Sequence, residues 1–333
     1  MARSYMGVVR YANGEPAVGV KVRLFDKDWI GKDDDLTVVA GVSDGYGRFT
    51  VIYDPTRDLD FADIYLPYLE FRYDFNGNPH IERKFIQPFK EEYHLPQFPP
   101  VKFIPSQHGL QFVNRFPGYW LPFSIPTIPD IPSVSAIYGL CGGMCATSYD
   151  FALVGLPTPP RRRVPGRVTP LHMYLHRRQV DSLGHMGKQV IRFIRWMTLP
   201  DEAVQLRTAV EVKKLKIQLD VGVPSPLGLV YVSTRDTLQI WQNHQVLAVG
   251  YRENNEELMI QLYEPNYPRR DDIYLKCWPD GKGGLRSQQL YGEKARHVRG
   301  FFMMPYNPVL PPKEMVFEEL KIDTLPESAR GYE

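Results

Sequence analysis

Two short stretches of the chain contain the residue types that thiol catalysis needs, a nucleophile and a base. The first, residues 138–145, reads Tyr-Gly-Leu-Cys-Gly-Gly-Met-Cys and leads into an apolar run over 146–156 that predicts a helix. Cys141 then lies where a helix begins, and unpaired backbone N–H groups and the helix dipole stabilise a thiolate there. The alternative interpretation is a small buried side chain packed behind two glycines.

His244 is the histidine whose sequence context suits a base. It precedes an apolar, strand-like run over 245–251, and a polar loop then leads to a second strand over 257–263. A hairpin of this length returns Glu264 or Asn266 to the side of His244, so that a carboxylate or an amide can orient the imidazole. Cysteine, histidine and an acid or amide, in that order along the chain, indicate nucleophilic catalysis.

These stretches resemble the papain-like cysteine peptidases, in particular the bacteriocin-processing branch. The resemblance is carried by Gly-Leu-Cys-Gly-Gly-Met at 139–144, Asn-His-Gln-Val-Leu-Ala-Val-Gly-Tyr at 243–251 and Tyr-Glu-Pro-Asn at 263–266. It implies an α+β domain in which helices precede an antiparallel sheet.

Transferred residue by residue, the resemblance makes Cys141 the nucleophile, His244 the general base and Glu264 the orienting acid. Asn266 faces the same side of an extended chain as Glu264 and is a competing orienter. Cys145 is the alternative nucleophile, because the stretch also resembles the Cys-Gly-x-Cys of papain itself.

The chain departs from the family pattern at two positions. Residues 133–140 contain no glutamine, so the family's usual donor to the oxyanion is missing. The loss of one such donor commonly slows an enzyme by about a hundredfold or more. The acid position holds Glu264 rather than aspartate, which moves the carboxylate by one methylene. These departures are the best evidence for the alternative, a catalytically inactive papain-like protein with a structural, assembly or binding role.

A zinc site is a weaker interpretation of the same region. Cys141 and Cys145 stand at positions i and i+4 of a predicted helix. His172 and His176 have the same spacing on a later predicted helix, so these four side chains could converge on one zinc ion. The glycines between the cysteines suit a helix start better than a metal-binding turn. We therefore predict no metal and no cofactor.

Strand-like runs separated by turn signals fill residues 7–103 and predict a β-sandwich. The runs over 7–11 and 18–25 flank Asn13-Gly14, which predicts that these two strands pair in a hairpin. The further predicted strands are 36–42, 48–53, 68–73 and 80–85, the last two flanking a turn at 76–79.

The sandwich region resembles the transthyretin-like domains. The matching motifs are Asn-Gly-x-Pro at 13–16, Ser-Asp-x-x-Gly-x-Phe at 43–49, Pro-Tyr-Leu at 67–69 and Arg-Lys-Phe at 83–85. The resemblance implies a carrier, adhesion or interaction module rather than an enzyme.

Acidic residues cluster on the turns of the same region, at Asp26, Asp28 and 33–35. Carboxylates on loops suit calcium, but the spacing of a known calcium loop is absent. Solvated turns are therefore the favoured interpretation.

The remaining chain divides into three parts. Nine prolines with interleaved aromatics over 95–132 predict an extended connector, residues 104–132, packed on the domains. Residues 133–306 form the predicted α+β domain, and 307–333 a tail with a short apolar stretch. The predicted helices are 171–182, 188–197 and 201–214, and the predicted strands are 215–219, 227–232, 245–251, 257–263 and 299–305.

Composition limits the partners. Lysine and arginine number 40 against 38 for aspartate and glutamate, so charge gives no argument for nucleic acid. No apolar run is long enough for a transmembrane segment and no signal peptide is visible, which leaves a cytoplasmic location or a signal-independent export route. Three cysteines are too few for a disulfide scaffold.

The sequence thus predicts a multidomain protein, a β-sandwich followed by a papain-like α+β domain. We expect a thiol hydrolase or acyl transferase acting on an amide, peptide or thioester bond of a protein or peptide. The sandwich would recruit the partner or substrate, or mediate homo- or hetero-assembly.

Overall fold

The computed structural model describes residues 2–28, 32–58, 65–75, 78–86, 91–96, 101–117, 137–167, 169–184, 187–235 and 237–312. The predicted turn at 76–77, the connector from residue 118 onward and the apolar stretch of the tail lie outside these residues.

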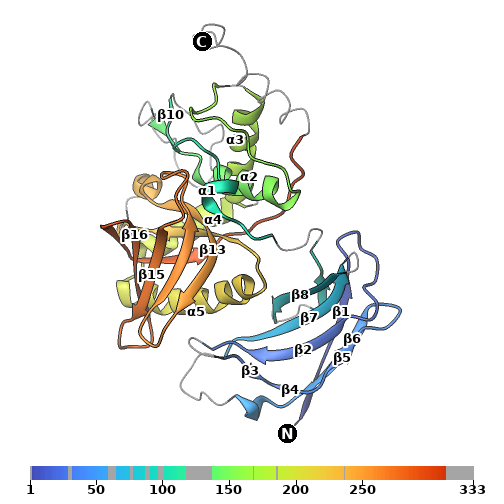
Figure 1. Cartoon of the computed structure of the whole chain (residues 1–333). Helices are drawn as coiled ribbons and strands as arrows, with labels where there is room; N and C mark the ends of the chain where they lie inside the picture. The colour runs from blue at the N-terminus through green and yellow to red at the C-terminus, as the bar shows by residue number, and fades with distance from the viewer. Residues whose placement is uncertain are drawn as a thin grey trace. The chain divides into compact units, whose positions relative to one another are not determined.

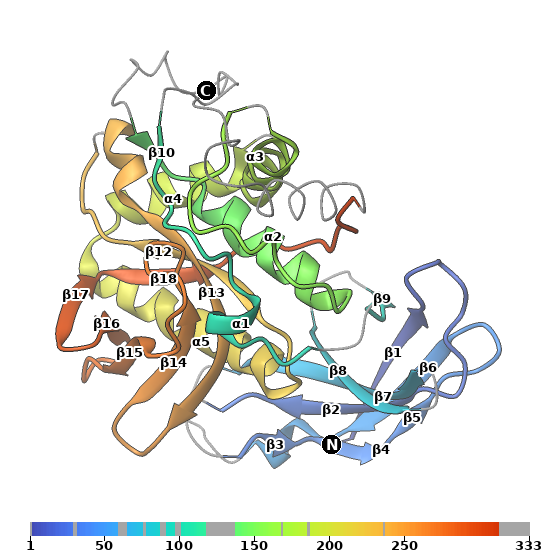
Figure 2. The ribbon, with the colours of Figure 1, turned by 45° about the horizontal axis from the view of Figure 1, so that its top comes forward.

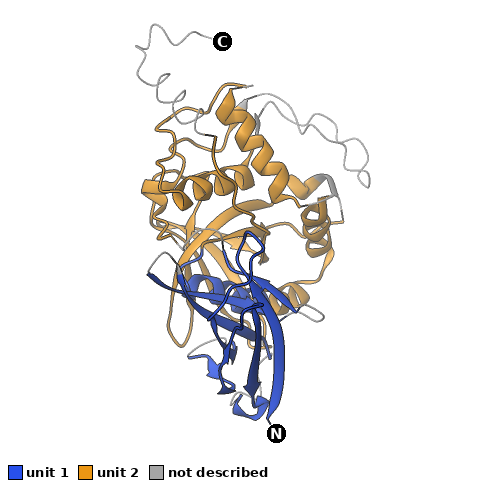
Figure 3. Ribbon diagram, turned by 90° about the vertical axis from the view of Figure 1, so that its right-hand side faces the viewer, with its two compact units in different colours: residues 1–100, 209–223 blue, residues 101–208, 224–333 orange. Residues whose placement is uncertain are grey.

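The chain divides into two compact, β-rich units (Figure 3). Unit 1 comprises residues 1–100 and 209–223, and unit 2 comprises 101–208 and 224–333. The long helix α5 (Asp201–Asp220) therefore contributes its first turns to unit 2 and its last turns to unit 1. The sequence predicted that the first domain ends at residue 103. It did not predict that residues 209–223 belong to the same unit.

Unit 1 has a sandwich-like arrangement of two sheets (Figure 1). One sheet has the order β4-β6-β1-β9, and the other has the order β3-β2-β7-β8 with β5 paired to β2. Buried Val9, Val22, Leu24, Phe49 and Phe71 belong to one core cluster, to which strands of both sheets contribute. The elements are β1 (Arg3–Arg10), β2 (Lys21–Asp26), β3 (Asp34–Asp35), β4 (Thr37–Val39), β5 (Gly41–Val42), β6 (Arg48–Tyr53), the 3-10 turn η1 (Pro55–Arg57), β7 (Pro67–Phe75), β8 (Asn78–Phe85) and β9 (Glu92–His94).

The predicted pairing of the first two strands is wrong. β1 pairs with β6 and β9, whereas β2 pairs with β7, β3 and β5, so the two strands belong to different sheets. The end of β1 instead contacts the segment before β2, through an isolated bridge from Arg10 to Pro16 and a hydrogen bond from the Ala17 N–H to the Val9 carbonyl at 3.0 Å. Alternation identified the residues that face the core, but it does not identify the strand that hydrogen-bonds to them.

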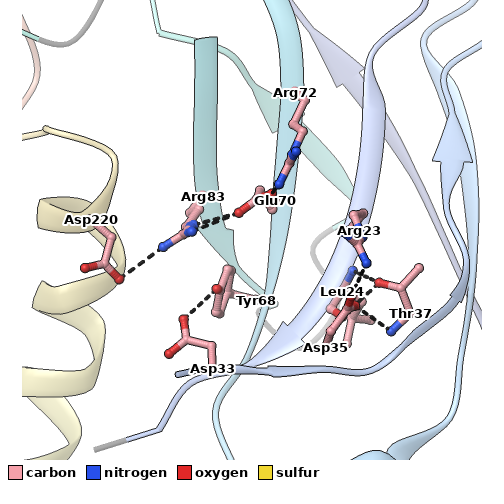
Figure 4. A network of polar contacts seen from close by, with 10 residues as sticks. All are labelled: Arg23, Leu24, Asp33, Asp35, Thr37, Tyr68, Glu70, Arg72, Arg83 and Asp220. Carbon is pink, nitrogen blue, oxygen red and sulfur yellow. Dashed lines mark hydrogen bonds and ion pairs between the residues drawn. The ribbon is translucent and has the colours of Figure 1, made fainter. Parts of the chain in front are cut away.

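A partly buried ion-pair network joins the second sheet to the last turn of α5 within unit 1 (Figure 4). The ammonium of Lys27, 2% exposed, lies 2.9 Å from Asp33 and 2.9 Å from Asp220. Arg83 bonds the same Asp220 carboxylate at 3.0 Å and Glu70 at 2.9 Å. Each buried charge is therefore compensated by opposite charge, as burial requires.

Other acidic side chains of the predicted turns also bind within the protein. Asp35 pairs with Arg23 and accepts the backbone N–H of Thr37 at 3.0 Å. Asp26 accepts the backbone N–H of Leu66 at 2.6 Å. Within the described residues, no group of three or more histidine, cysteine, aspartate and glutamate side chains could hold a metal ion.

Unit 2 combines helices with a curled, seven-stranded antiparallel sheet of order β17-β16-β15-β14-β13-β12-β18. Figure 2 shows α2 beside α3 and close to β13. The helices are α1 (Pro105–His108), α2 (Cys141–Leu153), α3 (Pro170–Ser182) and α4 (Lys188–Thr198), besides the start of α5 and the 3-10 helix η3 (Thr237–Gln242). The strands are β10 (Phe116–Pro117), β11 (Ile137–Tyr138), β12 (Ser225–Val230), β13 (His244–Glu253), β14 (Leu258–Tyr263), β15 (Ile273–Pro279), β16 (Leu285–Tyr291), β17 (Lys294–Val298) and β18 (Gly300–Met303).

The predicted strand over 215–219 is wrong, because α5 continues through it as one helix of 20 residues. Leu215 and Ile217 alternate with polar residues, which suggested a strand. Lys216 between them is also buried. The alternation of apolar and polar residues therefore does not correspond to a buried and an exposed face here. Neither α5 nor any other helix among the described residues is long and apolar enough to cross a membrane.

Close packing of α2 on α3 depends on a glycine. A β-carbon at Gly143 would lie 2.1 Å from the carbonyl oxygen of Leu175 in α3. Backbone atoms cannot yield as a flexible side chain can, so a larger residue would separate the two helices.

We therefore expect Gly143→Ala to lower the free energy of unfolding by about 2–4 kcal/mol, despite the better helix propensity of alanine. Gly250→Ala is the matched control, because a β-carbon at Gly250 meets nothing within 4 Å. It should change stability by less than about 1 kcal/mol. Urea denaturation followed by tryptophan fluorescence measures both, and equal midpoints for the two variants would contradict this packing.

A second prediction concerns Asp26, which is 2% exposed. Burial, together with the charge of Asp58, raises the pKa of Asp26 from 3.8 to about 6. A carboxyl group whose folded-state pKa exceeds its unfolded value destabilises the fold when ionised, and this penalty disappears as pH falls from about 6 to 4.

Asp26→Asn keeps an oxygen acceptor for the Leu66 N–H without the charge. We expect it to stabilise the protein by about 1–2 kcal/mol at pH 7 and to have little effect at pH 4. Denaturation at both pH values tests this, and a loss of stability at pH 7 would refute it.

Candidate active site

Cys141 is the first residue of α2, so the structure places its thiol at a helix N-terminus. The side chain is half-buried, whereas the ten residues that follow it, from Gly142 to Phe151, are buried. The thiol is thus the accessible end of an otherwise enclosed helix.

The second glycine-dependent contact brings the start of α2 against β13. A β-carbon at Gly142 would lie 2.2 Å from Oε1 of Gln245 and 2.4 Å from Oγ of Ser182. Gln245 directly follows His244 in β13. The absence of a side chain at Gly142 therefore allows the helix start, and Cys141 with it, to approach the histidine.

His244 is the first residue of β13 and is 9% exposed. Its Nε2 atom lies 2.5 Å from Oε1 of Glu264, and its ring also forms a side-chain hydrogen bond with Cys141. Because Nε2 is engaged by the carboxylate, Nδ1 is the nitrogen that remains for the thiol.

The environment of His244 favours the imidazolium. Burial alone would lower the pKa of His244, but the attraction of Glu264 and Cys141 and the hydrogen bonds to both outweigh it and raise the pKa to about 10. The ring is therefore positively charged at neutral pH.

Glu264 is a buried carboxylate, 2% exposed, with donors on both oxygens. Oε1 accepts from His244 and from the backbone N–H of Asn266 at 2.9 Å. Oε2 accepts from Nε2 of Gln289 at 2.6 Å. Three donors compensate the burial of this charge.

Asn266 occupies a secondary position. Its side-chain amide nitrogen lies 3.2 Å from Nε2 of His244, further than the carboxylate of Glu264. The β13–β14 register pairs Leu247 with Tyr263, and its continuation sets His244 opposite Asn266. Glu264 takes the imidazole N–H, and Asn266 supports the carboxylate through its backbone.

Gln289 and Tyr231 belong to this site and were missed from the sequence. The hydroxyl of Tyr231 donates to Oε1 of Gln289 at 2.6 Å, which fixes the amide that bonds Glu264. The guanidinium carbon of Arg296 lies 3.6 Å from the centre of the Tyr231 ring. Gln289 lies on β16, a strand that the sequence did not predict, and no short motif marks it.

Cys145 lies in the apolar core with Phe103, Leu247 and Tyr263, and is fully buried. Burial, and then the charges of Cys141 and Glu264, raise the pKa of Cys145 well above its ordinary value. Such a thiol stays protonated and enclosed. Cys277 is also fully buried, and all three cysteines are free.

The four residues of the zinc interpretation do not form a metal-binding group in the described part of the chain. His172 packs its ring against Phe116, with ring centres 5.9 Å apart, and lies 6.4 Å from the ring of His176. Burial lowers the pKa of both histidines.

A surface pocket of about 440 Å³ lies apart from this arrangement, between the start of α5 and strands β15–β17. Its lining includes none of the residues around Cys141; it consists of Asp201, Glu202, Gln205, Trp278, Asp280, Lys282, Arg286 and His297. Contacts and chemistry, rather than cavity size, therefore identify the candidate active site.

Comparison with known proteins adds little. No protein-family model matches the chain, and no curated protein matches it significantly. A solved structure, the 9R-lipoxygenase from Cyanothece PCC8801, aligns with 91% of this chain and 42% of its own at 12% identity and a TM-score of 0.21. The chain thus spans less than half of that protein, and so low a TM-score carries no argument about fold or function.

Replacement of Glu264 tests the electrostatics of the site. A histidine whose folded pKa of about 10 exceeds its unfolded value of 6.5 stabilises the fold fully below pH 6.5, and this contribution is lost as pH rises to about 10. We expect Glu264→Gln to lower the free energy of unfolding by about 2–4 kcal/mol at pH 6, with a difference from the wild type that shrinks towards pH 10.

Glu257→Gln is the control, because Glu257 forms a partly exposed ion pair with Lys276. It should cost less than about 1 kcal/mol, without this pH dependence. Urea denaturation at pH 6, 8 and 10 provides the measurement. A pH-independent difference for Glu264→Gln would show that the carboxylate does not hold the imidazolium.

Proposed function

We propose that unit 2 is a papain-like thiol hydrolase or acyl transferase acting on an amide, peptide or thioester bond. The observation that carries the proposal is the hydrogen-bonded series from Cys141 at the start of α2, through His244, to the buried carboxylate of Glu264. A nucleophile, a base and a group that orients the base are the three parts that this chemistry needs.

The arrangement of elements gives further support. The cysteine begins a helix that packs on the sheet, the histidine begins β13 and the acid follows β14. This order of helix before antiparallel sheet is the one that the papain-like resemblance implies.

The first half of the proposed reaction uses the charge state of the site. In the proposed reacting form of the site, the thiol proton of Cys141 has passed to the imidazole and the sulfur is the nucleophile. The sulfur attacks the carbonyl carbon, a carbon–sulfur bond forms and the carbonyl oxygen becomes an oxyanion. When the carbonyl reforms, the imidazolium gives its proton to the departing amine or thiol, leaving a thioester on Cys141.

The second half regenerates the thiol. Neutral His244 takes a proton from water, which attacks the thioester and releases a carboxylic acid, or from an amine, which accepts the acyl group. Glu264 holds the imidazole in one orientation through both halves and stabilises its cationic form.

Unit 1 is proposed as a transthyretin-like module that binds the protein or peptide on which unit 2 acts. Its sandwich-like sheets and its lack of a comparable cysteine and histidine pair among the described residues support a binding role. Assembly with other copies or other proteins through this unit is part of the same proposal.

Alkylation by iodoacetamide tests the thiol. We expect Cys141 to react at pH 6 at least about tenfold faster than a free cysteine, and His244→Ala to abolish the difference. Peptide mass spectrometry assigns the alkylated residue, and Cys145 and Cys277 should remain unmodified in the folded protein because they are enclosed.

His176→Ala provides the matched control, since it removes a half-buried imidazole on α3 and should leave the rate unchanged. If Cys141 reacts no faster than free cysteine at any pH from 5 to 9, the enzyme proposal fails. A catalytically inactive binding or structural protein would then be the better interpretation.

A further inference from the structure

We propose that the side-chain amide of Asn114 donates to the oxyanion of the reaction at Cys141. This inference rests on the proposed function, and it supplies the donor for which residues 133–140 contain no glutamine. Acyl transfer requires hydrogen-bond donors fixed where negative charge develops on the carbonyl oxygen.

The start of α2 supplies backbone donors but leaves few of them unused. The N–H of Gly143 donates to Gln179 at 3.0 Å and that of Met144 to the carbonyl of Leu140 at 2.8 Å. The amides of Cys141 and Gly142 have no acceptor among the described residues. The amides of Cys141 and Gly142 are therefore available as donors, and a side-chain donor from outside the helix would add to them.

Asn114 lies directly opposite the residue before Cys141. The antiparallel pair β10–β11 sets Phe116 against Tyr138, and continuing this register by two residues sets Asn114 against Leu140. Oδ1 of Asn114 accepts the N–H of Leu140 at 2.6 Å. The amide plane is thus anchored one residue away from the nucleophile.

The backbone of Asn114 is anchored to the other half of the site. Its N–H donates at 3.0 Å to the carbonyl of Pro265, the residue between Glu264 and Asn266. Asn114 therefore links the cysteine segment to the loop that carries the orienting acid.

These two anchors leave one group of the side chain unused, the Nδ2 amino group. It has no acceptor among the described residues, and it lies 2.9 Å from the position that a β-carbon at Gly139 would occupy. Gly139, beside which the amino group lies, is exposed, and Asn114 itself is 8% exposed. The amide of Gln111, three residues earlier in the chain, donates to the carbonyls of Ser106 and Gly109.

Two reagents separate this role from a structural one. Acylation of Cys141 by p-nitrophenyl acetate passes through an oxyanion, whereas alkylation by iodoacetamide does not. Acylation is measured in the full chain as the release of p-nitrophenolate that Cys141→Ser lacks. The ratio of the acylation rate to the alkylation rate then reports the oxyanion donor alone.

Asn114→Asp keeps the oxygen that accepts from Leu140 but removes the donor. We expect it to lower the ratio about a hundredfold, and Asn114→Ala to lower it by a similar factor. Gln111→Glu, the same change three residues earlier, should leave the ratio at the wild-type value.

The outcomes distinguish the two proposals. If the wild-type chain is acylated and Asn114→Asp has the same ratio of acylation rate to alkylation rate, the role of Asn114 is overturned. The backbone amides of Cys141 and Gly142 are then the donors. Parallel losses of acylation and alkylation also overturn it, because they indicate a structural role. A wild-type thiol that is alkylated but never acylated overturns the proposed function as well.

Discussion

The burial of the Glu264 carboxylate is the constraint on which the site depends. A charge that is 2% exposed is tolerated only if donors surround it, and here they come from β13, from β16 and from the loop after β14. His244 is one of these donors, so its ring orientation and its charge are both consequences of that burial. The amide of Gln289 is fixed in turn by the hydroxyl of Tyr231.

Glycine imposes the second constraint, through close approach rather than through flexibility. Neither Gly142 nor Gly143 has a left-handed backbone conformation, yet each touches atoms that leave no room for a β-carbon. Gly142 meets Gln245 of β13 and Ser182 of α3, and Gly143 meets the backbone of α3. The pair therefore sets how near the thiol can come to a strand that belongs to a distant part of the sequence.

Sequence patterns predicted the local parts of this structure and failed on the non-local ones. Glu264 lies near His244 because a single hairpin connects them, and the lengths of its strands and loop can be read from the sequence. Gln289 reaches the same carboxylate only through two further strand pairings, which no short motif encodes. Likewise, alternation placed Val9 and Leu24 in the core of unit 1, but their strands pair with partners far along the chain. Alternation at 215–219 misled because Lys216 as well as its apolar neighbours is buried there.

Unit 1 is discontinuous along the chain, and this affects how it can be synthesised. Lys27 and Arg83 leave the ribosome long before Asp220, the carboxylate that both of them bond. The first hundred residues thus emerge with Lys27 and Arg83 able to pair with Asp33 and Glu70 but not yet with Asp220, while more than a hundred residues of unit 2 follow. Domains that are continuous can fold as soon as they emerge. Residues 209–223 join unit 1 only after the segment that carries Cys141 has been translated, so the maturation of unit 1 is tied to that segment.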